Sequence, residues 1–193
     1  MARQVVVIAG PSGSGESTIT NEIIKRYPVR LARLVTATTR EPRDDEQSGV
    51  DYYFFTKEDF KREKELGHIP EFTYIENRDT YYGSYAPDLK KKLEKGNIVI
   101  VNPDIVGARY YKKMYDAVTI FIVPESVNEL ERRIRERSPD LSEEEVAHRR
   151  ENAAREMRDE RSFYDHVVTN ADGKLEQTVN DVVAILEKEG YTL

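Results

Sequence analysis

The sequence has 193 residues, of which 34% are charged, and its formal net charge at pH 7 is -6. This length suits one domain with a substantial core, and the apolar residues fall in short runs, as in a globular domain with a charged surface. The negative charge argues against a general binder of nucleic acid or of anionic membranes, because no large positive field is available.

The chain contains no cysteine, which excludes disulfides and thiolate metal sites. Its first apolar run, Val5 to Ile8, is too short for the apolar region of a signal peptide and far too short to span a bilayer. We therefore expect a cytoplasmic protein without a membrane segment.

The N-terminal segment has the pattern of a βαβ unit. Val5 to Ile8 is an unbroken β-branched run closed by Gly10, which is typical of a strand buried on both faces. After a Gly/Ser loop, isoleucines at helical spacing predict a helix from Ser17 to Tyr27, which Pro28 ends. The strand, loop and helix follow one another as this unit requires.

The middle of the chain, roughly residues 35 to 90, predicts a small β-rich insert with two flanking helices. Its expected elements are a strand at Leu34–Thr38, a strand at Tyr52–Phe55, a helix at Lys57–Leu66, and short strands at Phe72–Tyr74 and Tyr81–Tyr82.

Buried strands and amphipathic helices return in the second half. The expected elements are strands at Ile98–Val101, Ala117–Val123 and His166–Thr169, and helices at Ile105–Met114, about 127–137, from Ser142 onward and about 175–186. Ser142 followed by Glu145 is a capping box that starts the third of these helices. The pattern predicts an α/β fold with a parallel sheet core covered by helices.

The segment from Gly10 to Ser17 has the spacing of a phosphate-binding loop at every position but one. Its glycines let backbone N–H groups turn toward a polyphosphate, at the positive end of the helix that follows. Ser17 is placed to give its hydroxyl to Mg²⁺. The candidate ATP-binding residues here are Gly10, Ser12, Gly13, Ser14, Gly15, Ser17 and Thr18. The alternative is an ordinary turn between a strand and a helix.

The position that departs from the motif is Glu16, where the motif has a lysine that reaches the β- and γ-phosphates. The exchange removes a positive charge beside the polyphosphate and adds a negative one. Two unit charges about 4 Å apart interact by roughly 4 kcal/mol at an effective dielectric constant of 20. We predict that phosphoryl transfer is crippled or absent.

A second constellation begins at Thr38-Thr39-Arg40 and continues with Arg43, Glu46, Gly49, Tyr52 and Phe54. Together with the phosphate loop, it resembles the signature of the guanylate kinase family. The resemblance extends over essentially the whole chain, through Tyr81–Ser84, Asp104 with Gly107, the arginines of 133–149 and Tyr164–Asn170. It implies a P-loop NTPase-type core at about 1–34, 88–124 and 160–193, a GMP-binding insert at about 35–87 and a helical lid at about 125–159, all within one domain of residues 1–193.

The resemblance implies that Arg40, Arg43, Tyr52 and Tyr82 hold the phosphate of GMP. Arginine forks match phosphate oxygens, and phenol hydroxyls add neutral donors. The alternative is that the arginines only solvate a charged loop.

For guanine, the resemblance places Glu71 and Asp104 against the N1–H and amino donors, with Thr36 and Ser84 near the other polar edge. The stretch from Glu71 to Tyr81 is about two residues longer than is usual in the family. The alternative for Glu71 is a glutamate on a surface strand.

The resemblance also implies a closing lid, in which Arg133, Arg137 and Arg149 bring positive charge to the transferred phosphoryl group, together with Arg40. A solvated helix face suits Arg132, Arg135 and Arg150 better. Asn170 resembles the family's adenine contact. The three histidines have no catalytic or metal-binding setting.

Asn102 is a second departure, because the family usually has an aspartate there, near the magnesium. Glu16 either partly replaces that aspartate beside Mg²⁺ or is an inactivating change. We predict a Mg²⁺-dependent guanylate kinase with GMP and ATP as substrates. The alternatives are a non-catalytic binding module that recognises phosphorylated protein partners and a kinase of a phosphorylated sugar.

Overall fold

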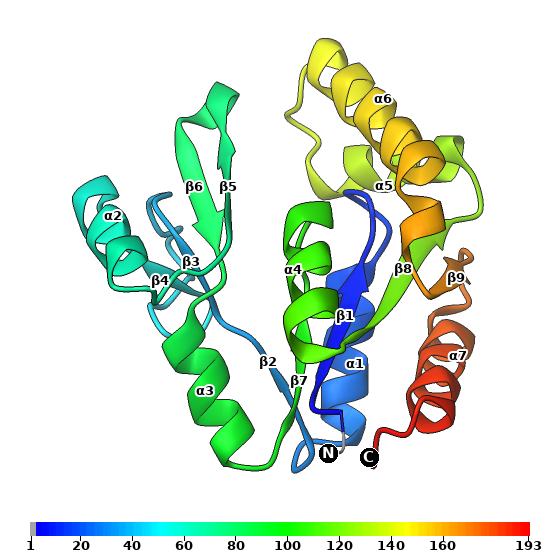
Figure 1. The fold of residues 1–193 in the computed structure, drawn as a ribbon. Coiled ribbons are helices and arrows are strands. Elements are labelled where there is room, and N and C mark those ends of the chain that lie inside the picture. The colour runs from blue at the N-terminus through cyan, green and yellow to red at the C-terminus, as the bar shows by residue number, and fades with distance from the viewer. Residues whose placement is uncertain (1–2) are drawn as a thin grey trace.

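Two β-sheets organise the chain, a parallel sheet of five strands and a separate mixed sheet of four (Figure 1). The computed structural model describes residues 3–193, apart from the side chain of Arg137. The five-stranded sheet has the order β2-β7-β1-β8-β9. Its strands are β1 (Val5–Ala9), β2 (Leu31–Arg33), β7 (Ile98–Val101), β8 (Val118–Pro124) and β9 (His166–Asn170).

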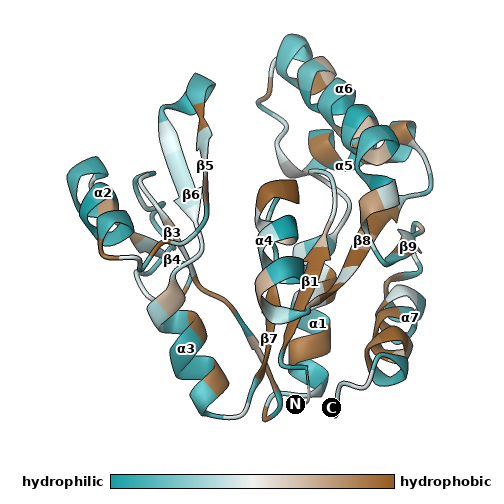
Figure 2. Ribbon diagram, in the orientation of Figure 1, coloured by the Kyte–Doolittle hydropathy of each residue, from teal (hydrophilic) through white to brown (hydrophobic). Residues whose placement is uncertain are grey.

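The central strands are buried on both faces, which explains their almost entirely apolar sequences (Figure 2). Val6 and Ile8 of β1 pack toward α1 (Glu16–Arg26) and α7 (Leu175–Lys188). Val5 and Val7 pack on the opposite face, which α3 (Ala86–Glu94) and α4 (Ile105–Tyr115) cover. The predicted α/β fold with a helix-covered parallel sheet is therefore confirmed.

The smaller sheet has the order β4-β3-β6-β5, in which β3 pairs in parallel with β4 and antiparallel with β6. Its strands are β3 (Thr36–Thr38), β4 (Tyr52–Phe54), β5 (Phe72–Ile75) and β6 (Thr80–Gly83). Helix α2 (Lys57–Glu65) packs on it through Phe60, beside Ala37 and Ile69. A 3₁₀ turn, Glu76–Arg78, connects β5 to β6.

Two further helices stand above the phosphate loop, α5 (Val127–Arg137) and α6 (Glu143–Asp159) (Figure 1). They pack on each other through Leu130, Ile134 and Ala153. The predicted capping box at the start of α6 is present, because Ser142 and Glu145 each accept a backbone hydrogen bond of the other. A short 3₁₀ turn, Arg161–Phe163, follows α6. Among residues 3–193, no helix has both the length and the apolar character needed to cross a membrane.

The single strand predicted at Leu34–Thr38 is wrong. The chain leaves the large sheet after Arg33 and enters the small one at Thr36. Between them, the amide of Leu34 still donates to Ile100 O of β7 (2.9 Å), whereas that of Val35 donates to Asp88 Oδ2 of α3 (2.9 Å). A run of β-prone residues does not indicate where the backbone changes partner, because both halves have the same local propensity.

Candidate functional site

The phosphate loop joins the end of β1 to the start of α1, and two of its glycines hold backbone angles that other residues rarely adopt. Gly13 and Gly15 have φ values of 93° and 92°. A Cβ atom on Gly15 would clash with Asn170 Nδ2, so the loop also needs glycine for close packing. The backbone of this loop therefore requires glycine at positions 13 and 15.

Asn170, the last residue of β9, supports this loop from beneath. Its side chain is buried, donates to Ser14 O (2.7 Å) and accepts from Thr178 Oγ1 of α7 (3.3 Å). In this structure, the predicted adenine contact thus uses its amide group to hold the phosphate loop.

Glu16 is the first residue of α1 and, with Ser17 and Thr18, lines a cavity of about 640 Å³ over the phosphate loop. Three other carboxylates line the same cavity: Asp104, Glu156 and Glu160. Burial raises the pKa of Glu156 to about 7, with help from Glu160 and Asp104. Burial and the charge of Asp104 also raise the pKa of Glu160. The cavity is therefore poor in positive charge, although helix N-termini favour anions.

Among the described residues that line this cavity, Arg133 is the only cation, and its guanidinium is already engaged. It donates to Glu129 Oε1 (2.8 Å), to Asn170 O (3.0 Å) and, at 3.5 Å, to Ser14 O. Arg133 thus ties α5 to the phosphate loop and to β9.

Asn102, at the end of β7, stands beneath the same cavity. Its Nδ2 donates to Ile8 O (2.8 Å) and to Thr20 Oγ1 (3.0 Å). Its Oδ1 is buried without a hydrogen-bond partner among the described residues. An aspartate here would have no N–H to give to Ile8 O, which is one physical reason why the neutral amide suits this position.

A second group of side chains gathers on the small sheet. Arg40 donates to Glu46 Oε1 (2.8 Å), and its guanidinium lies 5.4 Å from the ring centre of Tyr52. Tyr82 lies beside Tyr52, with 6.1 Å between ring centres. The hydrogen bond to Glu46 raises the pKa of Arg40, and the hydroxyl of Tyr82 adds to this effect. The structure thus brings three of the predicted GMP-phosphate residues together: Arg40, Tyr52 and Tyr82.

Glu46 holds this group in place. The side chain of Arg40 and the backbone N–H of Arg43 hold the pKa of Glu46 down at about 2. Arg43 itself is exposed, and its side chain lines the wider cleft described below. Thr36 lies on β3 in register with Tyr52 of β4 and is partly buried.

The predicted guanine-facing residues meet where β5 and β6 approach the start of α4. Glu71 Oε1 accepts hydrogen bonds from the backbone N (3.1 Å) and the hydroxyl of Ser84. A Cβ atom on Gly107 would lie only 3.0 Å from Glu71 Oε2. Burial raises the pKa of Glu71, and the charge of Asp104 adds to this effect, although the hydrogen bonds from Ser84 oppose it. Glu71 is therefore a half-buried carboxylate that Ser84 holds near Asp104.

Asp104 is the N-cap of α4, where its Oδ1 accepts from the backbone N–H groups of Val106 and Gly107 (both 3.0 Å). Its Oδ2 accepts from Thr73 Oγ1 of β5. One carboxylate thus connects the helix to the small sheet.

Two residues of this region were not predicted from the sequence. Tyr111, one helical turn beyond Gly107, is fully buried and donates to Ser84 Oγ (2.6 Å). Its spacing from Gly107 was an available signal, because residues four apart share a helix face. Thr73 contacts Asp104 only because β5 approaches α4, and local sequence carries no sign of that.

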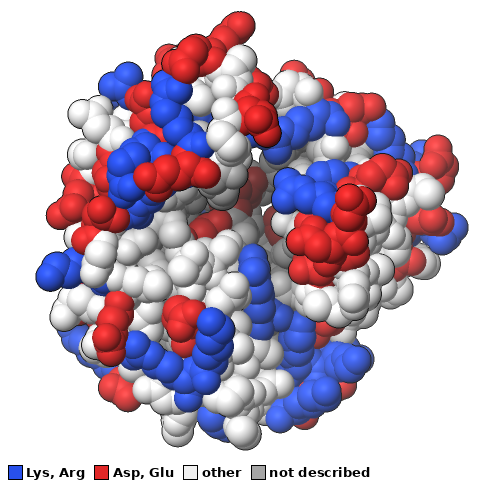
Figure 3. All heavy atoms as spheres, turned by 180° about the vertical axis from the view of Figure 1, so that it is seen from behind, with Lys and Arg blue, Asp and Glu red and all other residues white. Residues whose placement is uncertain are grey.

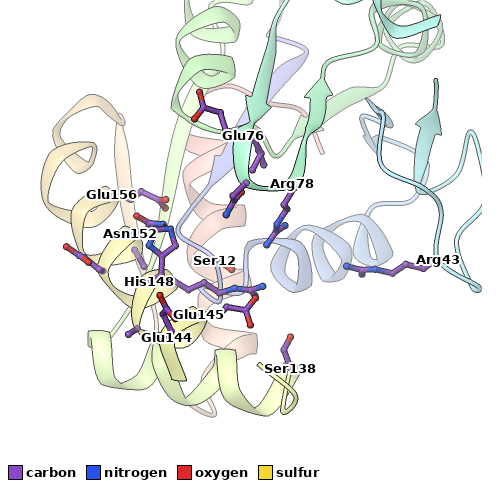
Figure 4. A pocket seen from close by; sticks show the side chains of 16 residues that line it. Ser12, Arg43, Glu76, Arg78, Ser138, Glu144, Glu145, His148, Asn152 and Glu156 are labelled. Carbon is purple, nitrogen blue, oxygen red and sulfur yellow. The ribbon is translucent and has the colours of Figure 1, made fainter. Parts of the chain in front are cut away.

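A wide cleft of about 1610 Å³ separates the β5–β6 hairpin from α6, and Ser12 of the phosphate loop also lines it (Figure 4). Arg43, Arg78 and Arg149 contribute cations to its walls. Arg137 of the predicted lid set lies outside the described side chains. Arg132, Arg135 and Arg150 form surface ion pairs with Glu129, Glu131, Glu136, Glu143 and Asp172, in agreement with a solvated face.

The view from behind shows positive and negative side chains interspersed over the surface, around a hollow in which acidic atoms are visible (Figure 3). No single-sign face of the kind that a general nucleic-acid binder needs is visible from this side.

Comparisons with known proteins agree with this geometry. The family model described as guanylate kinase matches residues 2–189. A guanylate kinase of Fusobacterium nucleatum is 35% identical over 182 residues, which make up 94% of each chain. A guanylate kinase of Carboxydothermus hydrogenoformans is 39% identical over 186 residues, or 96% of this chain and 88% of that protein.

Among solved structures, guanylate kinase from Anaplasma phagocytophilum superposes with a TM-score of 0.74 at 28% identity, covering 99% of this chain and 88% of the other. The family model and these relatives all match nearly the whole length of the chain, which includes both sheets and the phosphate loop. The chain belongs to the guanylate kinase family.

Proposed function

We propose that this protein binds GMP at the small sheet and ATP at the phosphate loop, and that it transfers the terminal phosphoryl group of ATP to GMP. Glu16 strongly reduces the rate of this transfer. The observation that carries this proposal is the neighbouring pair of carboxylates, the half-buried Glu71 and the exposed Asp104. Two neighbouring carboxylates, one of them half-buried, match the N1–H and amino donors of guanine. A kinase of a phosphorylated sugar would have no use for this pair.

At the acceptor end, the group Arg40, Tyr52 and Tyr82 suits the phosphate of GMP, with Arg43 added from the exposed loop. Thr36 and Ser84 complete the guanine end. Ser84 is held between Tyr111 and Glu71, so hydrogen bonds within the chain fix the direction of its hydroxyl.

At the donor end, the loop from Gly10 to Ser17 would hold the polyphosphate of ATP through backbone N–H groups. A phosphate oxygen of GMP would then attack the γ-phosphorus in line, while the bond from that phosphorus to the bridging oxygen of ADP breaks. GMP phosphate is largely dianionic near pH 7, so the step needs no protein base. Arg133, Arg149 and Arg137 are the proposed lid cations.

Mg²⁺ fits the residues at this end. Ser17 offers a hydroxyl beside the cavity, and the buried Oδ1 of Asn102 is a neutral oxygen donor without a partner among the described residues. Mg²⁺ prefers oxygen ligands, keeps several waters and needs few protein groups when phosphates are present. When bound, it would neutralise charge on the β- and γ-phosphates.

The division into a core, a GMP-binding insert at about 35–87 and a lid at about 125–159 is part of the same proposal. The insert corresponds to the small sheet with α2, and the lid to α5 and α6. The separate small cores of these two parts support their independent movement.

Glu16 favours a second candidate, a binding module that retains the GMP pocket without catalysis. Its carboxylate stands in a cavity that already contains Asp104, Glu156 and Glu160. Repulsion of roughly 4 kcal/mol for a pair of like charges about 4 Å apart would weaken both ATP binding and transition-state stabilisation.

The test combines calorimetry with an assay of GDP formation, on this chain and on Glu16→Lys. The proposal expects GMP to bind both proteins and the lysine variant to gain activity at least tenfold. GMP binding without activity in either protein would support the binding module. Absence of GMP binding in both would refute the proposed function.

A further inference from the structure

The tip of the β5–β6 hairpin is braced in a way that fixes the position of Arg78. The turn Glu76–Arg78 ends in Asp79, which has a φ of 48°. Asp79 accepts a hydrogen bond from the hydroxyl of Tyr74 on β5 (2.7 Å) and pairs with Lys57 of α2. Because Asp79 ties the tip to its own strand through Tyr74, the backbone of Arg78, the residue before Asp79, is held as part of the hairpin.

Arg78 extends from this braced tip into the wide cleft (Figure 4). Its side chain is exposed and has no hydrogen bond or ion pair with any described residue, while its carbonyl is held by Thr80 Oγ1 (2.8 Å). The phosphate loop lines the same cleft through Ser12. A guanidinium that no described carboxylate neutralises thus faces the region where ATP phosphates are proposed to lie.

The remaining cations near the phosphates are largely committed to other groups. Arg133 is tied to Glu129 and to two backbone carbonyls, and Arg40 is paired with Glu46. Arg43 and Arg149 also line the cleft. Arg43 is proposed to bind the phosphate of GMP, and Arg149 is proposed to act as a cation of the lid. Among the described side chains that line the cleft, Arg78 is the cation to which the function proposed above assigns no role.

We infer that Arg78 supplies positive charge to the ATP phosphates from the wall of the cleft opposite the phosphate loop. It would replace part of the positive charge that the motif's lysine provides and that Glu16 does not. This inference rests on the function proposed above. Approach of the hairpin to the phosphate loop would bring the guanidinium against phosphate oxygens, where its fork geometry and permanent charge suit them. An arginine delivered across a cleft can stabilise the charge of a phosphoryl group in transfer.

The competing use of Arg78 is an ion pair with α6 in a closed form. Glu144 and Glu151 also line the cleft, and neither has a partner among the described residues. The phosphates are favoured, because they carry more charge than one carboxylate and lie in a cavity short of cations. Exposed ion pairs contribute little by comparison.

The experiment measures the affinity for an adenosine and a guanosine joined by five phosphates, a probe that spans both nucleotide sites and needs no turnover. Arg78→Ala is compared with its parent in two backgrounds, one that keeps Glu16 and one that carries Glu16→Lys. We expect Arg78→Ala to raise the Kd about tenfold when Glu16 is kept and about threefold or less in the Glu16→Lys background, because lysine then supplies the charge. The Kd for GMP alone should stay within twofold.

Lys61→Ala is the matched control, since Lys61 is an exposed cation of α2 outside both cavities, and it should change nothing. The inference is overturned if Arg78→Ala leaves the Kd of the Glu16 protein unchanged or lowers affinity equally in both backgrounds. If Arg78→Ala weakens probe binding equally in both backgrounds, and the double variant Glu144→Gln, Glu151→Gln weakens it by the same factor, then Arg78 acts through an ion pair with α6 instead.

The same data separate this inference from the proposed function. If the probe binds only after Glu16→Lys, Arg78 does not compensate and the inference fails, while the GMP and ATP sites stand. If neither the probe nor GMP binds any of the proteins, the proposed function itself fails.

Discussion

Glu71 and Ser84 are joined by two hydrogen bonds to one carboxylate oxygen, from the backbone N–H (3.1 Å) and from the hydroxyl of Ser84. Tyr111 donates to the same hydroxyl (2.6 Å), so strands β5 and β6 and helix α4 meet at this carboxylate. The end of the site that is proposed to read guanine is therefore organised by hydrogen bonds within the chain itself.

The first prediction concerns Glu71→Gln. The amide keeps an oxygen that can accept from Ser84, but it loses the charge that would face the guanine donors. We expect GMP affinity to fall about 10- to 100-fold, as for the loss of a charge-assisted hydrogen bond. Calorimetric titration with GMP measures this change.

Thermal unfolding is the control for Glu71→Gln. Because burial raises the pKa of Glu71, the charged carboxylate is a cost to the folded state at neutral pH, and the neutral amide should not lower the unfolding midpoint. GMP affinity that stays within twofold would remove Glu71 from the guanine site.

The second prediction separates the two tasks of Asp104, which caps α4 and is proposed to face guanine. Asp104→Asn should keep the stability, since asparagine caps helices as well as aspartate does, whereas Asp104→Ala should lose about 1 kcal/mol. Both should weaken GMP binding at least fivefold, because both remove the charge. Urea unfolding and calorimetry check the two effects. If Asp104→Asn binds GMP normally, the residue has only the capping role.

The third prediction is a pH dependence of stability that depends on Glu156. Its pKa is about 7 in the folded protein and near 4.5 when exposed, so the folded state binds the extra proton between these values. Stability therefore falls as the pH rises from about 4.5 to about 7. Glu156→Gln, which mimics the neutral acid, should match the parent below pH 4.5 and exceed it above pH 7.

Denaturant unfolding at pH 4.5 and pH 8 measures this difference. We expect an advantage of Glu156→Gln on the order of 1 kcal/mol at pH 8, once solvent screening of this partly exposed group is allowed for. The exposed Glu151→Gln on the same helix is the matched control and should show no such pH dependence. An advantage of equal size at both pH values would contradict the assignment.

The fourth prediction is that Glu16→Lys stabilises the protein clearly only when nucleotide is bound. In the free protein, lysine loses the favourable interaction of a carboxylate with the helix dipole but gains attraction to Asp104, Glu156 and Glu160 in the same cavity, so these opposing effects should leave the stability within about 1 kcal/mol of the parent. With saturating MgATP, the variant should become the more stable of the two, because tighter binding adds to its stability. Thermal unfolding in both conditions tests this, and a variant that is less stable in both would argue against an ATP site.

The sequence by itself determined the class of fold and the phosphate loop. Unbroken β-branched runs such as Val5–Ile8 identified the buried strands, the glycine spacing located the turn into α1, and Ser142 with Glu145 located the start of α6. These features are local, because backbone propensity, turn geometry and capping depend on residues close together in the chain. The replacement of the motif's lysine by Glu16 can also be recognised from the sequence, because it is a change at one position of a local motif.

Only the tertiary structure decided which side chains share a site and which strand joins which sheet. It placed only Thr36–Thr38 of the predicted strand Leu34–Thr38 in a strand, and that strand in the small sheet. It also joined Ser84 to Glu71 and Tyr111, placed Thr73 against Asp104, and lined the cavity over the phosphate loop with Glu156 and Glu160. These relations connect residues that are far apart in the chain. They follow from how sheets and helices pack, which the local pattern of a sequence does not encode.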